Sequence, residues 1–110
     1  MNTKKEDLDK FGFSVCDRNE MEKVFRNFPE LEKVILFGSR AMNTFKPASD
    51  VDIALIYKTD DYHIVAEIKN KLEEETKIPY FFDVLDFKTI DSPELKEHVK
   101  LNGMEIYSRV

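Results

Sequence analysis

Cysteine, glycine and tryptophan are scarce in this chain of 110 residues, which contains one cysteine, three glycines and no tryptophan. A single cysteine cannot build a disulfide framework, and no spacing of Cys and His typical of a zinc site occurs. We therefore expect Cys16 to serve as a small apolar residue near the start of a helix.

Long apolar runs and an excess of positive charge are absent as well. No apolar run approaches the roughly 20 residues that cross a bilayer, and the charged segment 1–10 lacks the apolar core of a signal peptide. These absences predict a cytoplasmic protein that does not enter a membrane. Asp and Glu number 22 against 17 Lys and Arg, and the formal charge of −5 disfavours contact with a polyanion. We therefore expect no direct binding of nucleic acid.

Length and composition indicate one small domain. With 110 residues, of which 42% are hydrophobic, the chain can form one core but has no room for a second lobe. We expect a weakly ordered N-terminal extension over residues 1–16 and a single domain over residues 17–110.

Hydrophobic periodicity predicts an alternation of helices and strands. We expect the first helix to begin with a capping box of Asp17 and Glu20, and the last to begin at Ser92 and end at Gly103. The three glutamates 73–75 are expected on a solvated helix face. The predicted helices cover residues 18–28, 39–42, 61–76 and 93–102, and the predicted strands cover 33–37, 50–57, 80–87 and 104–107.

This order of elements favours an α/β (α+β) fold, in which a mixed β-sheet carries helices packed mainly on one face. The predicted strand 80–87 is apolar on both sides. Because such a pattern is typical of a strand covered on both faces, we expect it to be a central strand.

The apolar strand 33–37 stops abruptly at Gly38-Ser39-Arg40. Glycine lets the backbone come close to a ligand, and free N–H groups at a helix start attract phosphate oxygens. A simple turn is the commoner explanation of so short a motif. Arg40 is either a salt-bridging residue at the helix start or a donor to a phosphate or a partner.

Two aspartates stand two residues apart in Ser49-Asp50-Val51-Asp52. On a strand both carboxylates project from the same face, where they can converge on a hard cation such as Mg²⁺. The alternative is that Asp50 shapes the loop after Ser49 while Asp52 faces solvent. Against it, aspartate is disfavoured in strands, and two like charges side by side cost energy unless a cation neutralises them.

A third acid, Asp83, lies within the apolar run 80–87. We expect it to need a partner, because an unpaired buried carboxylate is costly. Asp86 is the rival, but it has the opposite strand parity and lies nearer the strand end. We therefore assign Asp83 to the site and Asp86 to structure or solvent.

Three carboxylates and a phosphate-binding turn indicate two-metal chemistry. One Mg²⁺ would lower the pKa of an attacking hydroxyl, and the other would hold a triphosphate and steady the leaving pyrophosphate. The predicted catalytic residues and metal ligands are therefore Asp50, Asp52 and Asp83. The two histidines, His63 and His98, are expected at the surface.

The segments Gly38-Ser39-Arg40-Ala41 and Ser49-Asp50-Val51-Asp52-Ile53-Ala54 resemble the signature of the DNA polymerase beta-like nucleotidyltransferase superfamily, and the small size resembles its minimal nucleotidyltransferase (MNT) branch. The resemblance implies that Gly38 and Ser39 bind the triphosphate of ATP, and we assign Arg40 a supporting role there. Family members commonly carry a second glycine where this chain has Asn43. Because Asn tolerates left-handed backbone, we expect the loop to form nonetheless.

The MNT branch also implies a partner. Its members resemble antitoxins that transfer AMP to a tyrosine of a HEPN-domain toxin and silence it. Two alternatives stay open: a non-catalytic antitoxin with a vestigial nucleotide site, and transfer to a small molecule, for which a homo-oligomer would have to supply the acceptor pocket.

Overall fold

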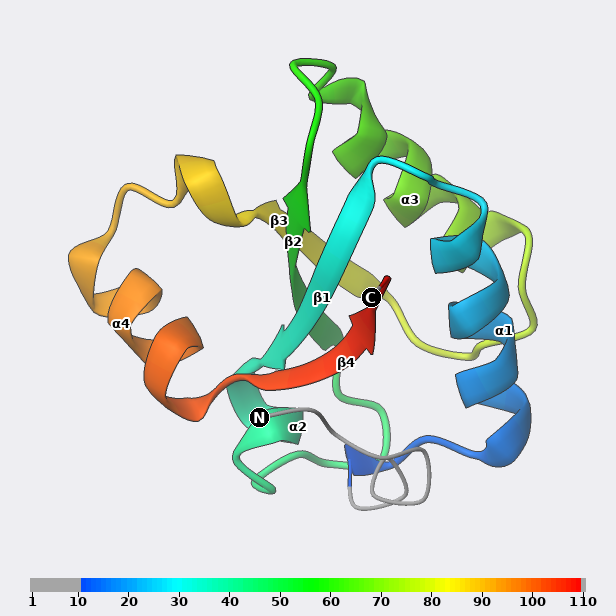
Figure 1. Ribbon diagram of the computed structural model, residues 1–110. Coiled ribbons are helices and arrows are strands. Elements are labelled where there is room, and N and C mark those ends of the chain that lie inside the picture. Colours follow the sequence, from blue (N-terminus) through cyan, green and yellow to red (C-terminus); the bar gives the residue numbers. More distant parts are fainter. Residues whose placement is uncertain (1–10, 110) are drawn as a thin grey trace.

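The computed structural model describes residues 11–109, and helices and strands alternate along them as the sequence predicts (Figure 1). None of these helices has the length and apolar character needed to cross a bilayer. The elements are α1 (Val15–Arg26), β1 (Leu31–Phe37), α2 (Gly38–Ala41), β2 (Val51–Tyr57), α3 (His63–Glu74), β3 (Phe82–Asp86), the 3₁₀ helix η2 (Phe87–Thr89), α4 (Pro93–Asn102) and β4 (Met104–Ser108).

The four strands form one mixed sheet in the order β3-β2-β1-β4. β1 pairs antiparallel with β2 and with β4, whereas β2 pairs parallel with β3. The predicted α/β (α+β) class with a mixed sheet is therefore confirmed. The expectation that strand 80–87 is central was wrong, because β3 is an edge strand.

β3 can be an edge strand despite its apolar sequence because side chains of α3 cover its free edge. The Lys69 ammonium donates to the Phe82 carbonyl, and the Phe82 N–H donates to the Glu73 carboxylate at 2.7 Å. These side chains satisfy backbone groups that an edge strand otherwise leaves unpaired. Glu73, expected on a solvated face, is thus a half-buried cap on the sheet edge.

Alternation along the strands divides the interior into two layers. Val51, Ile53 and Leu55 of β2 face the larger core, which α1 and α3 cover, while Ala54 faces a smaller cluster with Val99 of α4. Figure 1 shows α1 and α3 on one side of the sheet and α4 on the other. The predicted acids Asp50 and Asp52 share the parity of Ala54, so they belong to the α4 side.

The first helix begins earlier than predicted. Ser14 is its N-cap, and a capping box joins Ser14 to Asp17, where we expected Asp17 and Glu20. Phe11 and Phe13, in the segment expected to be a weakly ordered extension, are buried in the larger core, whereas residues 14–16 are exposed. Residues 1–10 of that predicted extension lie outside the described residues.

Candidate active site

Two of the three predicted carboxylates meet across the sheet. Asp52 of β2 and Asp83 of β3 are register partners in the parallel pair, and both lie on the α4 side. Asp50 lies just before β2, two residues from Asp52, and is exposed. The prediction that Asp83 and Asp52 share a face of the sheet is confirmed. The assumption that Asp83 is buried was wrong, because Asp83 is exposed on the edge strand.

Asp86, the rival of Asp83, has structural partners. One of its carboxylate oxygens accepts a hydrogen bond from the Tyr57 hydroxyl at 2.7 Å, and the other accepts from the Lys88 N–H at 3.0 Å at the start of η2. The buried hydroxyl and its bond to Asp86 raise the pKa of Tyr57 to about 12. Each carboxylate oxygen of Asp86 thus accepts a hydrogen bond from a group other than the predicted site residues.

Gly38 packs directly against the Asp52 carboxylate. The pairing of Phe37 with Asp52 in the antiparallel ladder brings the end of β1 beside this acid. Gly38 has φ +76°, and a Cβ at this position would lie 2.2 Å from Oδ2 of Asp52. Glycine is therefore required here both by the left-handed backbone and by the closeness of the carboxylate.

His98 is a site residue that our sequence reasoning missed. Its Nε2 accepts a hydrogen bond from the Gly38 N–H at 3.2 Å, and its ring meets the Phe37 ring edge-on at 6.3 Å. α4 crosses the second face of the sheet and delivers the imidazole to the end of β1. The one available signal was helical spacing, since His98 follows Leu95 by three residues on the packed side of α4.

Charge and burial act together on Asp52. Burial raises the pKa of its carboxyl, and the neighbouring negative charges of Asp83 and Asp50 raise it further. The positive charge of Arg40 and the nearby His98 imidazole oppose this effect but do not overcome it. The site therefore carries unrelieved negative charge of the kind that a bound cation neutralises.

The donor set suits Mg²⁺, which prefers carboxylate oxygens. Asp50, Asp52 and Asp83 would be the residues that hold it. Within residues 11–109, no three acidic, histidine or cysteine side chains already surround one metal position. Mutual repulsion of the carboxylates accounts for their separation, and a cation would remove that repulsion.

Arg40 was predicted to bind the nucleotide in a supporting role. The residue is 1% exposed, and its guanidinium donates to the carbonyl oxygens of Phe11 and Ser49. Ser39 is half-buried, and its carbonyl accepts from the Thr44 N–H at 2.9 Å. This bond closes the turn in which Asn43 adopts φ 59°, the left-handed backbone expected at that position.

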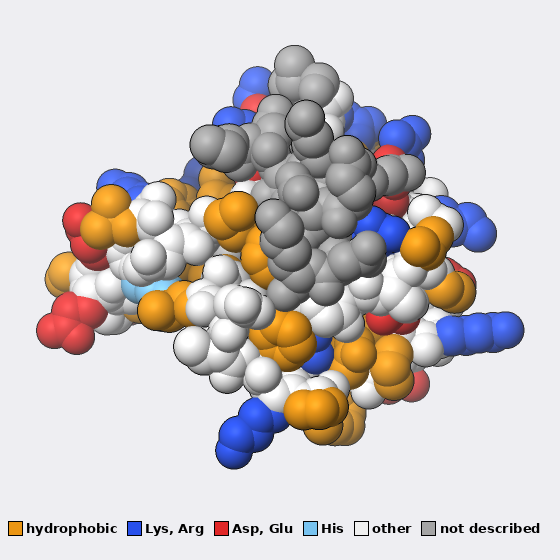
Figure 2. All heavy atoms as spheres, turned by 90° about the horizontal axis from the view of Figure 1, so that it is seen from below, with side chains coloured by type: hydrophobic (Ala, Val, Ile, Leu, Met, Phe, Trp, Pro, Cys, Tyr) orange, Lys and Arg blue, Asp and Glu red, His pale blue; other side chains and the backbone are white. Residues whose placement is uncertain are grey.

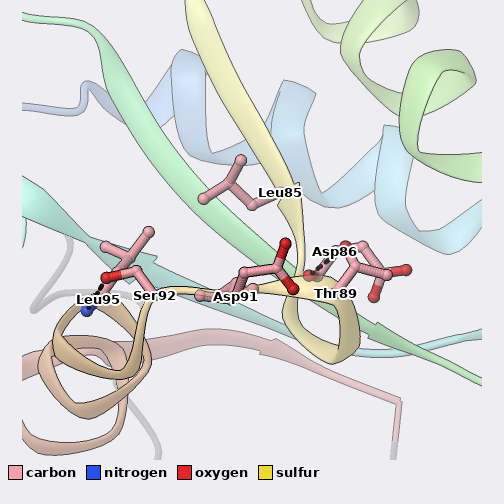
Figure 3. A pocket seen from close by; sticks show the side chains of 7 residues that line it. Leu85, Asp86, Thr89, Asp91, Ser92 and Leu95 are labelled. Carbon is pink, nitrogen blue, oxygen red and sulfur yellow. Dashed lines mark hydrogen bonds between the residues drawn. The ribbon is translucent and has the colours of Figure 1, made fainter.

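A pocket of about 160 Å³ lies beyond Asp83, where β3 leads through η2 to α4. Figure 3 shows side chains from these three elements around it, including the carboxylates of Asp86 and Asp91. Pockets that enclose small-molecule ligands usually measure roughly 300–1,000 Å³. This pocket is therefore too small to enclose a nucleoside triphosphate.

Two large apolar side chains are exposed near the acids. Met42 follows α2 and is 52% exposed, and Phe81 is 74% exposed while its carbonyl accepts a hydrogen bond from the Val51 N–H. Figure 2 views the molecule from the end that carries α2 and shows apolar side chains interspersed with charged ones.

Comparison with known families decides the assignment. The family pattern described as Polymerase beta, Nucleotidyltransferase matches residues 19–110. The chain belongs to this nucleotidyltransferase family. No curated protein matches its sequence significantly.

Solved structures share the fold of this nucleotidyltransferase domain. A toxin-antitoxin crystallised with AMP-PNP aligns with a TM-score of 0.67 at 28% identity, over 83% of this chain and 73% of that chain. The toxin-antitoxin MntA-HpeT, in a variant with two aspartates two positions apart changed to glutamate, aligns with a TM-score of 0.64 at 25% identity, over 83% and 72%. A Sulfolobus solfataricus protein shows the same fold, with a TM-score of 0.56 at 24% identity over 99% and 93%.

Proposed function

We propose that this nucleotidyltransferase moves AMP from ATP to a tyrosine hydroxyl of a HEPN-domain toxin and thereby acts as an antitoxin. The observation that carries the proposal is the pairing of Asp52 with Asp83 beside Gly38, which supplies oxygen ligands next to a backbone turn. The likeness to a toxin-antitoxin with AMP-PNP supports both the nucleotide and the kind of partner.

The proposed reaction forms one bond and breaks one. The acceptor oxygen attacks the α-phosphorus of ATP and forms a new P–O bond. The bond from the α-phosphorus to the oxygen that bridges it to the β-phosphorus breaks, and pyrophosphate leaves. The hydroxyl proton passes to a site carboxylate or to water. Mg²⁺, when bound, supplies charge neutralisation for the triphosphate and lowers the pKa of the acceptor hydroxyl.

The chain's own residues provide position and charge. Asp50, Asp52 and Asp83 would hold the cation, and Gly38 and Ser39 would contact the triphosphate. Because the Gly38 N–H is bonded to His98 Nε2, a phosphate oxygen that takes this N–H must displace the imidazole or share it. The carboxylates would hold the cation that the triphosphate needs, and the turn would orient the phosphate for the attacking hydroxyl.

A protein acceptor fits this chain better than a small molecule. Phe81, which is 74% exposed, offers apolar surface beside the start of β2, where its carbonyl accepts a hydrogen bond from the Val51 N–H. The net charge of −5 would also favour approach to a basic toxin. Cytoplasmic location and self-association stay predictions from the sequence.

The test is transfer of label from ATP carrying ³²P at the α-position to the cognate toxin. We expect labelled toxin with wild-type protein and Mg²⁺, no label from γ-labelled ATP, and loss of labelling in Asp50→Asn and Asp52→Asn. Asp60→Asn is the matched control, because this exposed acid lies beyond the other end of β2. Unchanged labelling in both site variants would sink the proposal.

Protection of the toxin distinguishes catalysis from simple contact. The proposal requires that the wild-type protein neutralise the toxin only when ATP and Mg²⁺ are present. Equal protection without them would instead support a stoichiometric antitoxin with a vestigial nucleotide site.

A further inference from the structure

Arg40 is a buried cation with an unusual set of partners. Its Nη1 donates to the Phe11 carbonyl at 2.7 Å, and its Nη2 and Nε donate to the Ser49 carbonyl at 2.8 and 3.3 Å. All of these acceptors are main-chain oxygens, and within residues 11–109 no carboxylate forms a salt bridge with it. Burial of an unpaired guanidinium is costly, so this environment must compensate it in another way.

Aromatic rings supply that compensation. The centre of the guanidinium lies 4.1 Å from the ring centroid of Tyr80, 5.0 Å from that of Phe45 and 5.2 Å from that of Phe13. Each distance lies within the range of cation–π attraction, which strengthens when water is excluded. The guanidinium is therefore held on its faces by rings and at its edges by carbonyl oxygens.

The chain around Arg40 has little room to adjust. Gly12 has φ +86°, and a Cβ there would lie 2.5 Å from Nη1 of Arg40 and 2.7 Å from the Phe45 ring. The Tyr80 hydroxyl donates to the Gly12 carbonyl at 3.3 Å, which closes this enclosure. The position of the guanidinium is thus fixed from several segments far apart in the sequence.

The Ser49 carbonyl is the acceptor that matters for the site. The peptide group that contains this carbonyl also contains the N–H of Asp50, and β2 begins at the next residue, Val51. Two donors on one carbonyl fix the plane of that peptide, so they restrict the direction of the Asp50 side chain. The loop before it, residues 42–48, is almost entirely exposed, and its hydrogen bonds to Ser49 join Lys46 to the Ser49 hydroxyl and N–H, not to the Ser49 carbonyl.

We propose that Arg40 is a positioning residue, whose guanidinium holds the Ser49–Asp50 peptide so that the Asp50 carboxylate faces the cation site with Asp52. The inference rests on the proposed function, because it assumes that these acids bind a divalent cation. The rival role is that of a counter-charge, in which only the positive charge of Arg40 acts on the carboxylates.

Two substitutions separate positioning from charge. Arg40→Lys keeps the positive charge but loses the planar guanidinium that reaches the Phe11 and Ser49 carbonyls. Arg40→Met loses the charge as well as the guanidinium donors. If Arg40 positions Asp50, both variants should bind Mn²⁺ about 10-fold or more weakly, as for other groups that orient metal ligands. If charge alone matters, Arg40→Lys should bind like wild type and Arg40→Met more tightly, and that result would overturn the inference.

Mn²⁺ binding, measured by electron paramagnetic resonance without nucleotide or toxin, is the readout, and circular dichroism gives the folded fraction of each variant. Arg26→Met is the matched control, since Arg26 is exposed and pairs with Glu22. Leu72 is a buried core residue of α3, so Leu72→Ala is the control for a general loss of stability. Equal weakening in Leu72→Ala, corrected for the folded fraction, would assign the effect to stability and overturn the inference.

A milder change keeps the test decisive if Arg40→Lys does not fold. Phe45→Leu removes one ring beside the guanidinium and leaves its charge and donors intact, and we expect about fivefold weaker Mn²⁺ binding. Unchanged Mn²⁺ affinity in folded Phe45→Leu would then overturn positioning by Arg40. If the wild-type protein does not bind Mn²⁺, the proposed function and this inference are both overturned. If the wild-type protein binds Mn²⁺ and the variants bind it with the same affinity, only the inference is overturned.

Discussion

Asp52 and Asp83 face each other across the parallel pair of β2 and β3, although 31 positions separate them along the chain. Side chains of register partners on one face lie close enough to interact. The charge of Asp83 is accordingly the largest charge effect that raises the pKa of Asp52. The sheet thus holds two carboxylates in a repulsive pair, and this arrangement leads to the predictions that follow.

Substitution of Asp83 should abolish transfer, while substitution of its neighbour Asp86 should not. Asp83→Asn removes a carboxylate from the cation site, and we expect labelling of the toxin to fall at least about 100-fold. Asp86→Asn weakens the bond to Tyr57 and should cost about 1 kcal/mol of stability with nearly normal transfer. Labelling assays and urea unfolding measure the two effects, and loss of transfer in Asp86→Asn alone would reverse our assignment.

Removal of the Asp52 charge should stabilise the protein in the absence of divalent cations. The pKa of Asp52 is raised in the fold, so its ionisation opposes folding as pH rises above the ordinary value of 3.8. Asp52→Asn should therefore gain about 1 kcal/mol at pH 7 in EDTA, a typical gain when a functional charge is relieved. The gain should vanish in acid, below that ordinary pKa.

Thermal unfolding with EDTA and with MgCl₂ measures this effect. Mg²⁺ should raise the melting temperature of wild type but not that of Asp52→Asn, because a ligand stabilises only the form that binds it. Asp60→Asn is the control for loss of an exposed acid. A lower melting temperature of Asp52→Asn than of wild type in EDTA at pH 7 would contradict the prediction.

The Glu73 cap on the sheet edge should contribute to stability in a pH-dependent way. The hydrogen bond from the Phe82 N–H lowers the pKa of Glu73 below its ordinary value of 4.5. Its contribution is therefore present above that value and is lost as pH falls through the lowered pKa. Glu73→Gln should cost about 1 kcal/mol at pH 7 and little in strong acid.

Hydrogen exchange of the Phe82 amide is the direct measurement, since this N–H should exchange faster in Glu73→Gln. Glu74→Gln is the matched control, because Glu74 is the next residue on α3 and is exposed. Equal protection of Phe82 in wild type and Glu73→Gln would show that the charge of the Glu73 carboxylate does not strengthen this bond in solution.

His98 should stabilise the turn at Gly38. His98→Ala leaves the Gly38 N–H without its acceptor, which should cost about 1 kcal/mol, and His98→Gln should restore part of the loss by offering a carbonyl oxygen. His63→Ala is the control, since His63 is exposed and, among residues 11–109, its hydrogen bonds are to nearby Asp61. Urea unfolding measures the series, and equal stability of His98→Ala and His63→Ala would rule out the role of His98.

Local pattern determined much of this protein. Alternation of Val51, Ile53 and Leu55 with Asp50, Asp52 and Ala54 predicted β2 and placed Asp50 and Asp52 on one face, because side chains alternate along a strand. The same parity separated Asp83 from Asp86. Ser92, Pro93 and Gly103 marked both ends of α4, since capping depends on neighbouring residues alone.

Tertiary structure decided what depends on distant contacts. The sequence could not show that β3 lies at the edge, because strand order follows from how α3 and α4 pack on the sheet. It could not show that Arg40 turns inward, since Phe13, Phe45 and Tyr80 meet only in the fold. The sequence by itself determined which acids share a face. Only long-range packing decided which of these acids lie side by side and that the Arg40 guanidinium lies near them.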